Sequence, residues 1–268
     1  MTIQMAILII LLTLIVGSIF YALVARYSPE GGRSDRTPTN VYVVTGGAMS
    51  LLIAFTMAAT FSQYNQGQAA AQQEADAVLT MWRATAFMSP EVGSPLRDQL
   101  VCYADEVINV EWPAMADGNG SVSSEVTQTL RESDSILASN VSGAGVGLGM
   151  WESANSQRLA AHQSRLLVAE TGVPPLLMLL LIIGSIITIG SLIVYADKSK
   201  PTWGHTLVII GPLFVASAAI VVIAFFDHPY SDTPGSIKPT AMKVALTHIT
   251  QDQIAGLPLP TCTGSPTP

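Results

Sequence analysis

The feature that most constrains the fold of this chain is an uncharged apolar segment that continues into an amphipathic helix. Val41–Phe61 contains no Asp, Glu, Lys or Arg, and at about 1.5 Å per helical residue it can cross a hydrocarbon core of roughly 30 Å. No proline follows before Pro90, and an apolar stripe of helical spacing continues to about Met88: Ala71, Ala75, Val78, Leu79, Trp82 and Ala86. The sequence predicts a helix that crosses a membrane and continues outside it.

Three further apolar segments predict three more transmembrane helices: Met5–Ala25, Pro174–Ala196 and Thr206–Phe226. Met5–Ala25 has no basic residue before it, and its apolar part is longer than that of a cleaved signal peptide. It is therefore interpreted as a spanning helix. The composition agrees, since 49% of the residues are hydrophobic and 12% are charged.

The predicted fold class is all-α: four transmembrane helices with a helical bundle inserted between the second and third spans. The expected domains are 1–61 with the first two transmembrane helices, 62–172 as the extramembrane bundle, and 173–230 with the last two transmembrane helices. The tail 231–268 is rich in Pro, Thr, Ser and Gly, and is expected to be partly disordered.

The inserted segment has helical periodicity throughout. One apolar stripe begins at Leu96 and is predicted to end at Glu111-Trp112-Pro113. Serines at 121–124 offer N-caps for a helix to about Asn140, and a final helix is expected from about Met150 to Thr171. The alternating glycines at 143–149 lack a preceding strand and the Lys-Ser/Thr of a phosphate-binding loop, so they are interpreted as a flexible connection.

Catalytic and metal-binding sites are not predicted. The four histidines are scattered, and the two cysteines have no CxxC spacing. No cofactor is therefore expected, and the chain is not expected to be an enzyme. The net charge of −7 argues against a nucleic-acid partner, which requires a basic surface.

The charge distribution predicts an orientation in the cell membrane. The short loops at 26–40 and 197–205 carry five Lys or Arg, whereas the four residues before the first span carry none. The positive-inside rule then places both loops in the cytoplasm and the large helical domain in an extracytoplasmic position. There Cys102 and Cys262 share an oxidising compartment, where a disulfide between them is possible.

The segment 62–172 is acidic, with thirteen Asp or Glu against five Arg. Two interpretations remain open. The charges are either the solvated surface of a bundle or the lining of a vestibule that concentrates cations. The spans themselves contain no Asp, Glu, Lys or Arg, which argues against a transporter that carries an ionisable group at membrane depth.

Several motifs resemble those of a known family. They are Glu111-Trp112-Pro113, Arg158 with Arg165-Leu166, and Phe226-Asp227-His228-Pro229-Tyr230-Ser231. Together they are similar to motifs of the bestrophin-like bacterial membrane proteins, a family of unknown function, over about Gly46 to Met242. The family is distantly similar to the bestrophins, which are pentameric four-span ion channels with a large cytoplasmic domain.

This resemblance implies roles for individual residues. Bestrophin channels line a narrow neck with bulky apolar residues of their second helix, and the corresponding positions here are Gly47, Leu51 and Phe55. Gly47 departs from that bulky pattern. The resemblance implies structural roles for Glu111, Trp112, Pro113, Arg165, Asp227, Pro229 and Tyr230. Glu111 and Asp227 are the best candidates for structural polar residues, and Trp112 suits an interface or the bundle core.

Two functions from different classes follow as hypotheses. The first is a multi-pass, homo-oligomeric ion channel whose pore is lined by the second helix. The second is an accessory or sensory membrane subunit whose extramembrane bundle docks a membrane-protein partner. In both cases the lipid bilayer is the surrounding medium.

Overall fold

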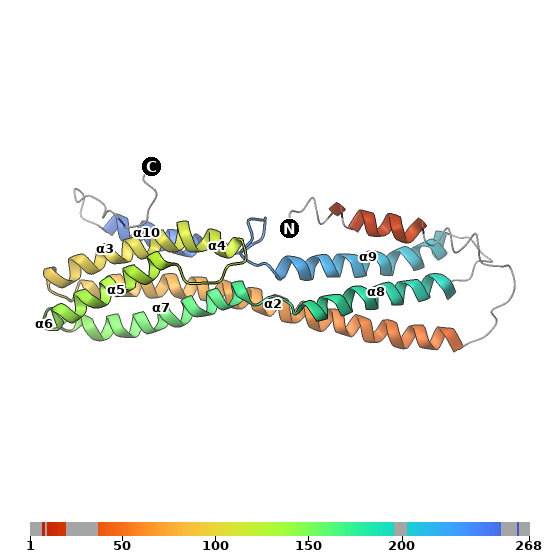
Figure 1. Ribbon diagram of the computed structural model, residues 1–268, viewed down its shortest axis with the longest axis horizontal. Coiled ribbons are helices and arrows are strands. Elements are labelled where there is room, and N and C mark those ends of the chain that lie inside the picture. Colours follow the sequence, from red (N-terminus) through yellow and green to blue (C-terminus); the bar gives the residue numbers. More distant parts are fainter. Residues whose placement is uncertain (1–6, 9, 20–36, 196–202, 253–261, 263–268) are drawn as a thin grey trace. The chain divides into compact units, whose positions relative to one another are not determined.

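The computed structural model describes residues 7–8, 10–19, 37–195, 203–252 and 262. Over these residues the chain is helical and contains no strand (Figure 1), which confirms the predicted all-α class. It divides into two compact units. Unit 1 consists of Met1–Ser62 and Val173–Asp227, and unit 2 consists of Gln63–Gly172 and His228–Pro268.

Unit 1 contains a helix at Ile10–Ile19, the first part of α2 (Thr37–Thr85), α8 (Pro175–Tyr195) and α9 (Trp203–Phe226). Among the described residues, α2 from Val44 is the one helix long and apolar enough to cross a membrane by itself. The consecutive helices α7 and α8 make a second candidate if they form one span. The predicted span Met5–Ala25 and both short loops extend beyond the described residues.

Small residues allow the helices of unit 1 to pack closely. The Thr13 hydroxyl donates a hydrogen bond to Ser217 Oγ at 3.0 Å. A Cβ added at Gly17 would collide with the side chain of Leu213, and one added at Gly184 would lie 2.7 Å from the sulfur of Met49. Glycine at these two positions therefore makes room for side chains of the neighbouring helices.

Unit 2 is a bundle with its own hydrophobic core. Beside the second part of α2 it contains α3 (Pro90–Glu106), η1 (Val107–Glu111), α4 (Trp112–Ala116), α5 (Ser124–Ser139), α6 (Val141–Ala144), α7 (Gly147–Glu170) and α10 (Thr240–Asp252). The longer helices lie side by side (Figure 1). Trp151, Tyr103, Met81, Leu96 and Val78 are among the completely buried side chains between them.

The predicted helix end at Glu111-Trp112-Pro113 is wrong. The chain passes from α3 through a π-helical segment, η1, and continues as α4 to Ala116. The Trp112 N–H donates to the carbonyl of Val107, five residues earlier. Pro113 lies in the first turn of α4, where its missing N–H needs no partner within that helix. A proline in this position permits a helix rather than ending it.

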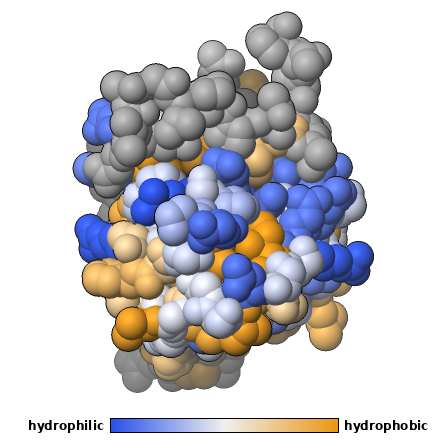
Figure 2. Space-filling view, turned by 90° about the vertical axis from the view of Figure 1, so that its left-hand side faces the viewer, coloured by the Kyte–Doolittle hydropathy of each residue, from blue (hydrophilic) through white to orange (hydrophobic). Residues whose placement is uncertain are grey.

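The connections around α5 and α6 follow the predicted chemistry more closely. Ser123 caps α5, because its hydroxyl accepts a hydrogen bond from the Val126 N–H at 3.1 Å. Gly145 has a φ of 50°, and a Cβ at Gly147 would lie 2.6 Å from the carbonyl of Ala84. Gly145 therefore allows a left-handed backbone conformation, and Gly147 allows close packing against α2. Figure 2 shows this end of unit 2, where hydrophobic surface lies among hydrophilic side chains; Val146 is 86% exposed.

The segment after Asp227 contains more regular structure than its composition suggested. It forms α10, whose residues Met242, Ala245 and Ile249 are buried in the core of unit 2. Cys262 is joined by a disulfide to Cys102 on α3, with a Cα–Cα distance of 5.2 Å. The other residues after Asp252, where disorder was expected, lie outside the described ranges.

Candidate functional site

A buried arginine in unit 2 joins two glutamates from different helices. Arg165 on α7 is 0% exposed. Its Nε donates to Glu74 Oε2 on α2 at 2.6 Å, and its Nη2 donates to Glu111 Oε2 in η1 at 2.8 Å. Both carboxylates are almost completely buried. The guanidinium therefore connects three helical segments through charge-assisted hydrogen bonds.

Three more buried side chains extend this centre. The Tyr103 hydroxyl of α3 donates to Glu74 Oε1 at 2.5 Å, and His162 Nδ1 lies 2.9 Å from the same oxygen. Arg158 Nη1 donates to Tyr103 Oη at 3.1 Å, and its guanidinium lies over the Tyr103 ring. We call this set the Arg165 network: Glu74, Tyr103, Glu111, Arg158, His162 and Arg165.

The electrostatics of the network keep its charges in place. Burial alone would raise the pKa of Glu74, but the charge of Arg165 and the hydrogen bonds from His162 and Arg165 hold it at about 2. Burial opposes the charge of Arg165, yet Glu74 and Glu111 raise its pKa further. Burial and the Glu74 charge raise the pKa of Tyr103 well above its ordinary value. At neutral pH Glu74 and Arg165 are therefore ionised and Tyr103 is neutral.

An aromatic pair covers one side of the network: Trp112 of α4 and Tyr230 of the C-terminal segment. The Arg165 guanidinium lies 5.0 Å from the centroid of Trp112, which meets the Tyr230 ring edge-on at 5.6 Å. Trp112 Nε1 donates to the carbonyl of Ile237 at 3.2 Å. Gly67 on α2 makes room for this packing, since a Cβ there would lie 2.8 Å from the Tyr230 hydroxyl oxygen.

The residues singled out by the resemblance fall into two groups. Glu111, Trp112, Arg165 and Tyr230 converge in unit 2 although they come from distant parts of the sequence. Pro229 belongs to the same segment, and its carbonyl accepts from the Ile237 N–H at 2.7 Å. Pro113 follows Trp112 within α4.

Asp227 is the motif residue of unit 1. Its carboxylate accepts a hydrogen bond from the backbone N–H of Val173, just before α8. It therefore connects the end of α9 to the residues that begin α8. The bond joins residues that are 54 positions apart in the sequence.

Gly47, Leu51 and Phe55 lie at four-residue intervals on α2 in unit 1. Leu51 is 61% exposed and Phe55 71% exposed, and among the described residues nothing lies within 4 Å of a Cβ added at Gly47. Thr56 and Thr60, in contrast, are buried. Described residues of unit 1 thus cover one face of this part of α2, and they leave the face with the three predicted residues exposed.

Glu74, Tyr103 and His162 were not predicted as site residues. One signal for Glu74 is present in the sequence, since it is the first charged residue after Arg36 and adjoins the apolar stripe of Ala71, Ala75 and Val78. An acidic residue beside a buried stripe requires a partner. Tyr103 and His162 carry no comparable signal.

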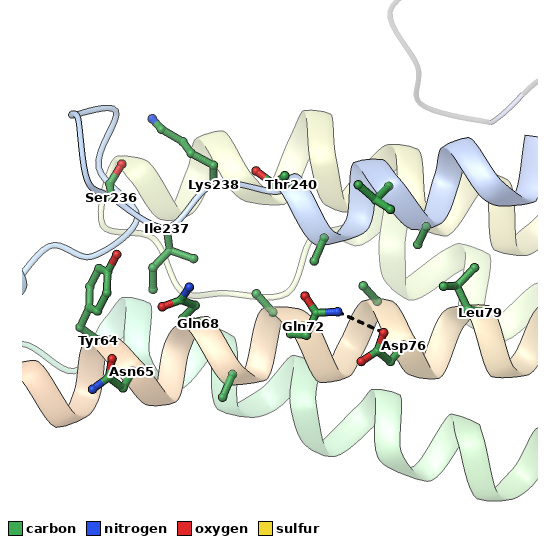
Figure 3. Close-up of a pocket in the computed structure, with 16 residues that line it drawn as sticks. Tyr64, Asn65, Gln68, Gln72, Asp76, Leu79, Ser236, Ile237, Lys238 and Thr240 are labelled. Atoms are coloured by element: carbon green, nitrogen blue, oxygen red, sulfur yellow. Dashed lines mark hydrogen bonds between the residues drawn. The ribbon is translucent and has the colours of Figure 1, made fainter.

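An open groove runs along the same bundle between α2 and the C-terminal segment (Figure 3). Its volume is about 700 Å³. Asn65, Gln68, Gln72 and Asp76 line one side, and Gln72 donates to Asp76 at 3.1 Å. Ile237 points from the other side toward α2. The described residues contain no group of three or more His, Cys, Asp or Glu that could hold a metal ion.

Comparisons with known proteins identify the family. The bestrophin-like domain model matches residues 11–242. Crystal structures of a bacterial bestrophin homologue from Klebsiella pneumoniae have the same fold. A variant of it with a tyrosine changed to alanine is 13% identical, covers 93% of this chain and 99% of its own, and gives a TM-score of 0.68. A variant with a tryptophan changed to alanine is also 13% identical, covers 94% of this chain and 98% of its own, and gives a TM-score of 0.70.

A further crystal structure, described only as that of a membrane protein with a glycine changed to alanine, is 12% identical. It covers 91% of this chain and 97% of its own, and gives a TM-score of 0.71. No curated protein matches the sequence. The resemblance seen in the motifs is confirmed. With the fold of a bestrophin-like membrane protein and a family match over most of its length, this chain belongs to the bestrophin-like family.

Proposed function

We propose that this protein is a multi-pass membrane protein that assembles with copies of itself and conducts small ions through a pore lined by α2. The observation that carries the proposal is the uncovered apolar face of Gly47, Leu51 and Phe55 in a chain of the bestrophin-like family. A hydrophobic constriction can gate ions by dewetting without any charged residue in the span. The bestrophin resemblance makes a pentamer the expected assembly.

Four spans are part of the proposal. The helices α8 and α9 have 21 and 24 residues and contain no Asp, Glu, Lys or Arg. At about 1.5 Å per residue, each is long enough for a hydrocarbon core of roughly 30 Å. The apolar helix at Ile10–Ile19 supplies the described part of the first span.

The Arg165 network has a structural role in this proposal. It ties Glu74 on α2 to η1 and α7, so that α2 is held by charged hydrogen bonds within unit 2. Its charged groups Glu74, Glu111 and Arg165 are already paired with one another and buried from solvent. This pairing favours an anchoring role over catalysis, and we propose that the protein is not an enzyme.

We further propose that unit 2 is extracytoplasmic. The Lys and Arg of the two short loops favour this orientation. The disulfide between Cys102 and Cys262 supports it independently, because disulfides persist in oxidising compartments. Bestrophins place their large domain in the cytoplasm, so this orientation would be inverted. In intact cells a membrane-impermeant reagent should label a cysteine introduced at exposed Ser135; exclusive labelling after lysis would contradict it.

Conductance measurements test the pore. Phe55→Ala should change the single-channel conductance of purified protein in planar bilayers, whereas Leu180→Ala, a change at another exposed apolar residue on α8, should not. Currents absent from the wild-type protein, or a monomeric mass in detergent, would overturn the proposal. A monomer would leave the α2 face without the neighbouring copies needed to enclose a pore.

The groove of Figure 3 favours a second candidate function, an accessory or sensory subunit. A groove lined by amide and small apolar side chains between α2 and the C-terminal segment offers a surface for a partner protein. A partner that co-purifies in equal amounts would favour this function, provided that crosslinking detects no self-association. Gln68→Arg should then release the partner without altering the mass of the protein itself.

A further inference from the structure

His162 lies between the two glutamates that Arg165 connects. Its Nδ1 is 2.9 Å from Glu74 Oε1, and its Nε2 is 3.6 Å from Glu111 Oε1. The side chain is 3% exposed. A ring nitrogen therefore faces a buried carboxylate oxygen on each side, one from α2 and one from η1.

A neutral imidazole cannot serve both carboxylates, because only one of its nitrogens carries a proton. With the proton on Nδ1, the ring donates to Glu74, and the lone pair of Nε2 faces the Glu111 oxygen. Within the described residues Nε2 has no hydrogen-bond partner. A second proton converts this nitrogen into a donor directed at Glu111.

The other groups around the ring are charged or donate elsewhere. Arg165 Nη2 lies 3.1 Å from Nδ1, but its hydrogens are directed at Glu111 Oε2 at 2.8 Å and Glu74 Oε1 at 3.2 Å. The Tyr103 hydroxyl donates to Glu74. Arg158 donates to Tyr103 and Asn155, and Tyr230 lies beyond Trp112. The two guanidinium groups oppose a third positive charge, and the two carboxylates favour it.

We propose that His162 is a proton-operated bridge that fastens α7 to α2 and η1 when it is protonated. Histidine is the side chain whose ordinary charge change lies nearest neutral pH, so the bridge is tested between about pH 5 and pH 8. Its consequence for ion conduction rests on the proposed channel function, but its effect on unit 2 does not. Acidification strengthens the attachment of α7 to η1, and neutral or alkaline pH weakens it.

The experiment measures backbone hydrogen exchange of the purified full-length protein at several values between about pH 5 and pH 8, corrected for intrinsic exchange. Exchange in η1 and around residue 162 of α7 should slow by about tenfold toward the acidic end, the scale of one hydrogen bond to a charged group. His162→Gln should remove this dependence. The matched control His248→Gln, at an exposed position on α10, should retain it.

A second measurement keeps the test decisive if His162→Gln does not fold. In protein with ¹⁵N-labelled histidine, which has four such residues, the ring-nitrogen shifts should show the second proton on His162 at the pH values where exchange in η1 is slow. Glu106 is another buried acid whose titration could contribute to the pH dependence. Repeating the hydrogen-exchange measurement in the Glu106→Gln variant removes that contribution. A neutral His162 throughout, or exchange in η1 independent of pH, would overturn the bridge. Absent ion currents would overturn the channel and leave this result standing.

Discussion

The two units of this chain pack by different physical means. In unit 1 the hydroxyls of Thr56 and Ser217 donate to carbonyls of their own helices, and contacts between helices depend on small residues such as Gly184. In unit 2 a buried arginine, two glutamates and a disulfide hold the elements together. Apolar helices in lipid gain little from hydrophobic burial, whereas a bundle in water can fix its register with paired charges.

Of the changes considered, removing Arg165 should destabilise unit 2 most, because the charge pairing that distinguishes it from unit 1 depends on this residue. Arg165→Met leaves Glu74 and Glu111 buried without their cation, which should lower the free energy of unfolding of unit 2 by about 3–5 kcal/mol. Urea unfolding of the purified protein measures it. The control Arg131→Met, at an exposed position on α5, should change stability by less than about 0.5 kcal/mol. Equal effects of the two changes would show that the network adds nothing specific.

Reduction of the disulfide tests the covalent part of the same unit. Cys102→Ala with Cys262→Ala should destabilise unit 2 by about 2–4 kcal/mol, because the bond closes a long loop in the unfolded chain. Thermal unfolding with and without a reductant gives the value. The reductant should lower the unfolding temperature of the wild type but not that of the double variant. A wild type insensitive to reductant would contradict the bond.

Two glycine substitutions sharpen the comparison between units. Gly67→Ala in unit 2 places a methyl group 2.8 Å from the Tyr230 hydroxyl and should cost about 1–3 kcal/mol by overpacking. Gly184→Ala in unit 1 meets the flexible end of Met49, which can move, and should cost less. Unfolding free energies of both variants check the order. A larger loss for Gly184→Ala would reverse it.

Glu106 should make the stability of unit 2 depend on pH. Burial raises its pKa to about 7, and the charges of Glu125, Asp105 and Glu132 act in the same direction, although the Thr129 hydroxyl donates to it. Between its ordinary pKa of 4.5 and about 7, the folded state keeps a proton that the unfolded state has lost. Stability should therefore fall as pH rises through this window.

Thermal unfolding from about pH 4.5 to pH 8 measures this effect, and Glu106→Gln should flatten the profile. Hydrogen exchange in α3 and α5 locates the change, since Thr129 belongs to α5 and Glu106 ends α3. A profile unchanged by Glu106→Gln would assign the dependence to another group.

The sequence was sufficient for the helices but not for the network. Periodicity and serine caps located α5 and α7 to within a few residues, since these signals are local. Glu74 and His162 are 88 positions apart, and no local pattern relates them. Their contact depends on which faces of α2 and α7 meet. Family motifs supplied Glu111, Trp112 and Arg165 without showing that Arg165 joins two acids.

The C-terminal helix shows a second limit. Its segment was interpreted from composition, which is rich in Pro, Thr and Ser. Because composition alone was considered, the helical spacing of Met242, Ala245 and Ile249 was overlooked. These are the residues that α10 buries. Thirteen residues are too few for a stable isolated helix. The helix depends on the bundle surface, which a single sequence does not display.

The π-helical segment has a consequence for how family sequences correspond to one another. Because η1 takes one residue more than an α-helical turn would, each later residue of this helix lies where its predecessor would lie in an uninterrupted α-helix. The difference is a rotation of about 100°. That rotation directs Trp112 to the guanidinium of Arg165. A relative with an ordinary helix here would have one residue fewer between Tyr103 and Trp112. A single deletion in η1 that restored an α-helical turn would thus leave the same face of α4 buried.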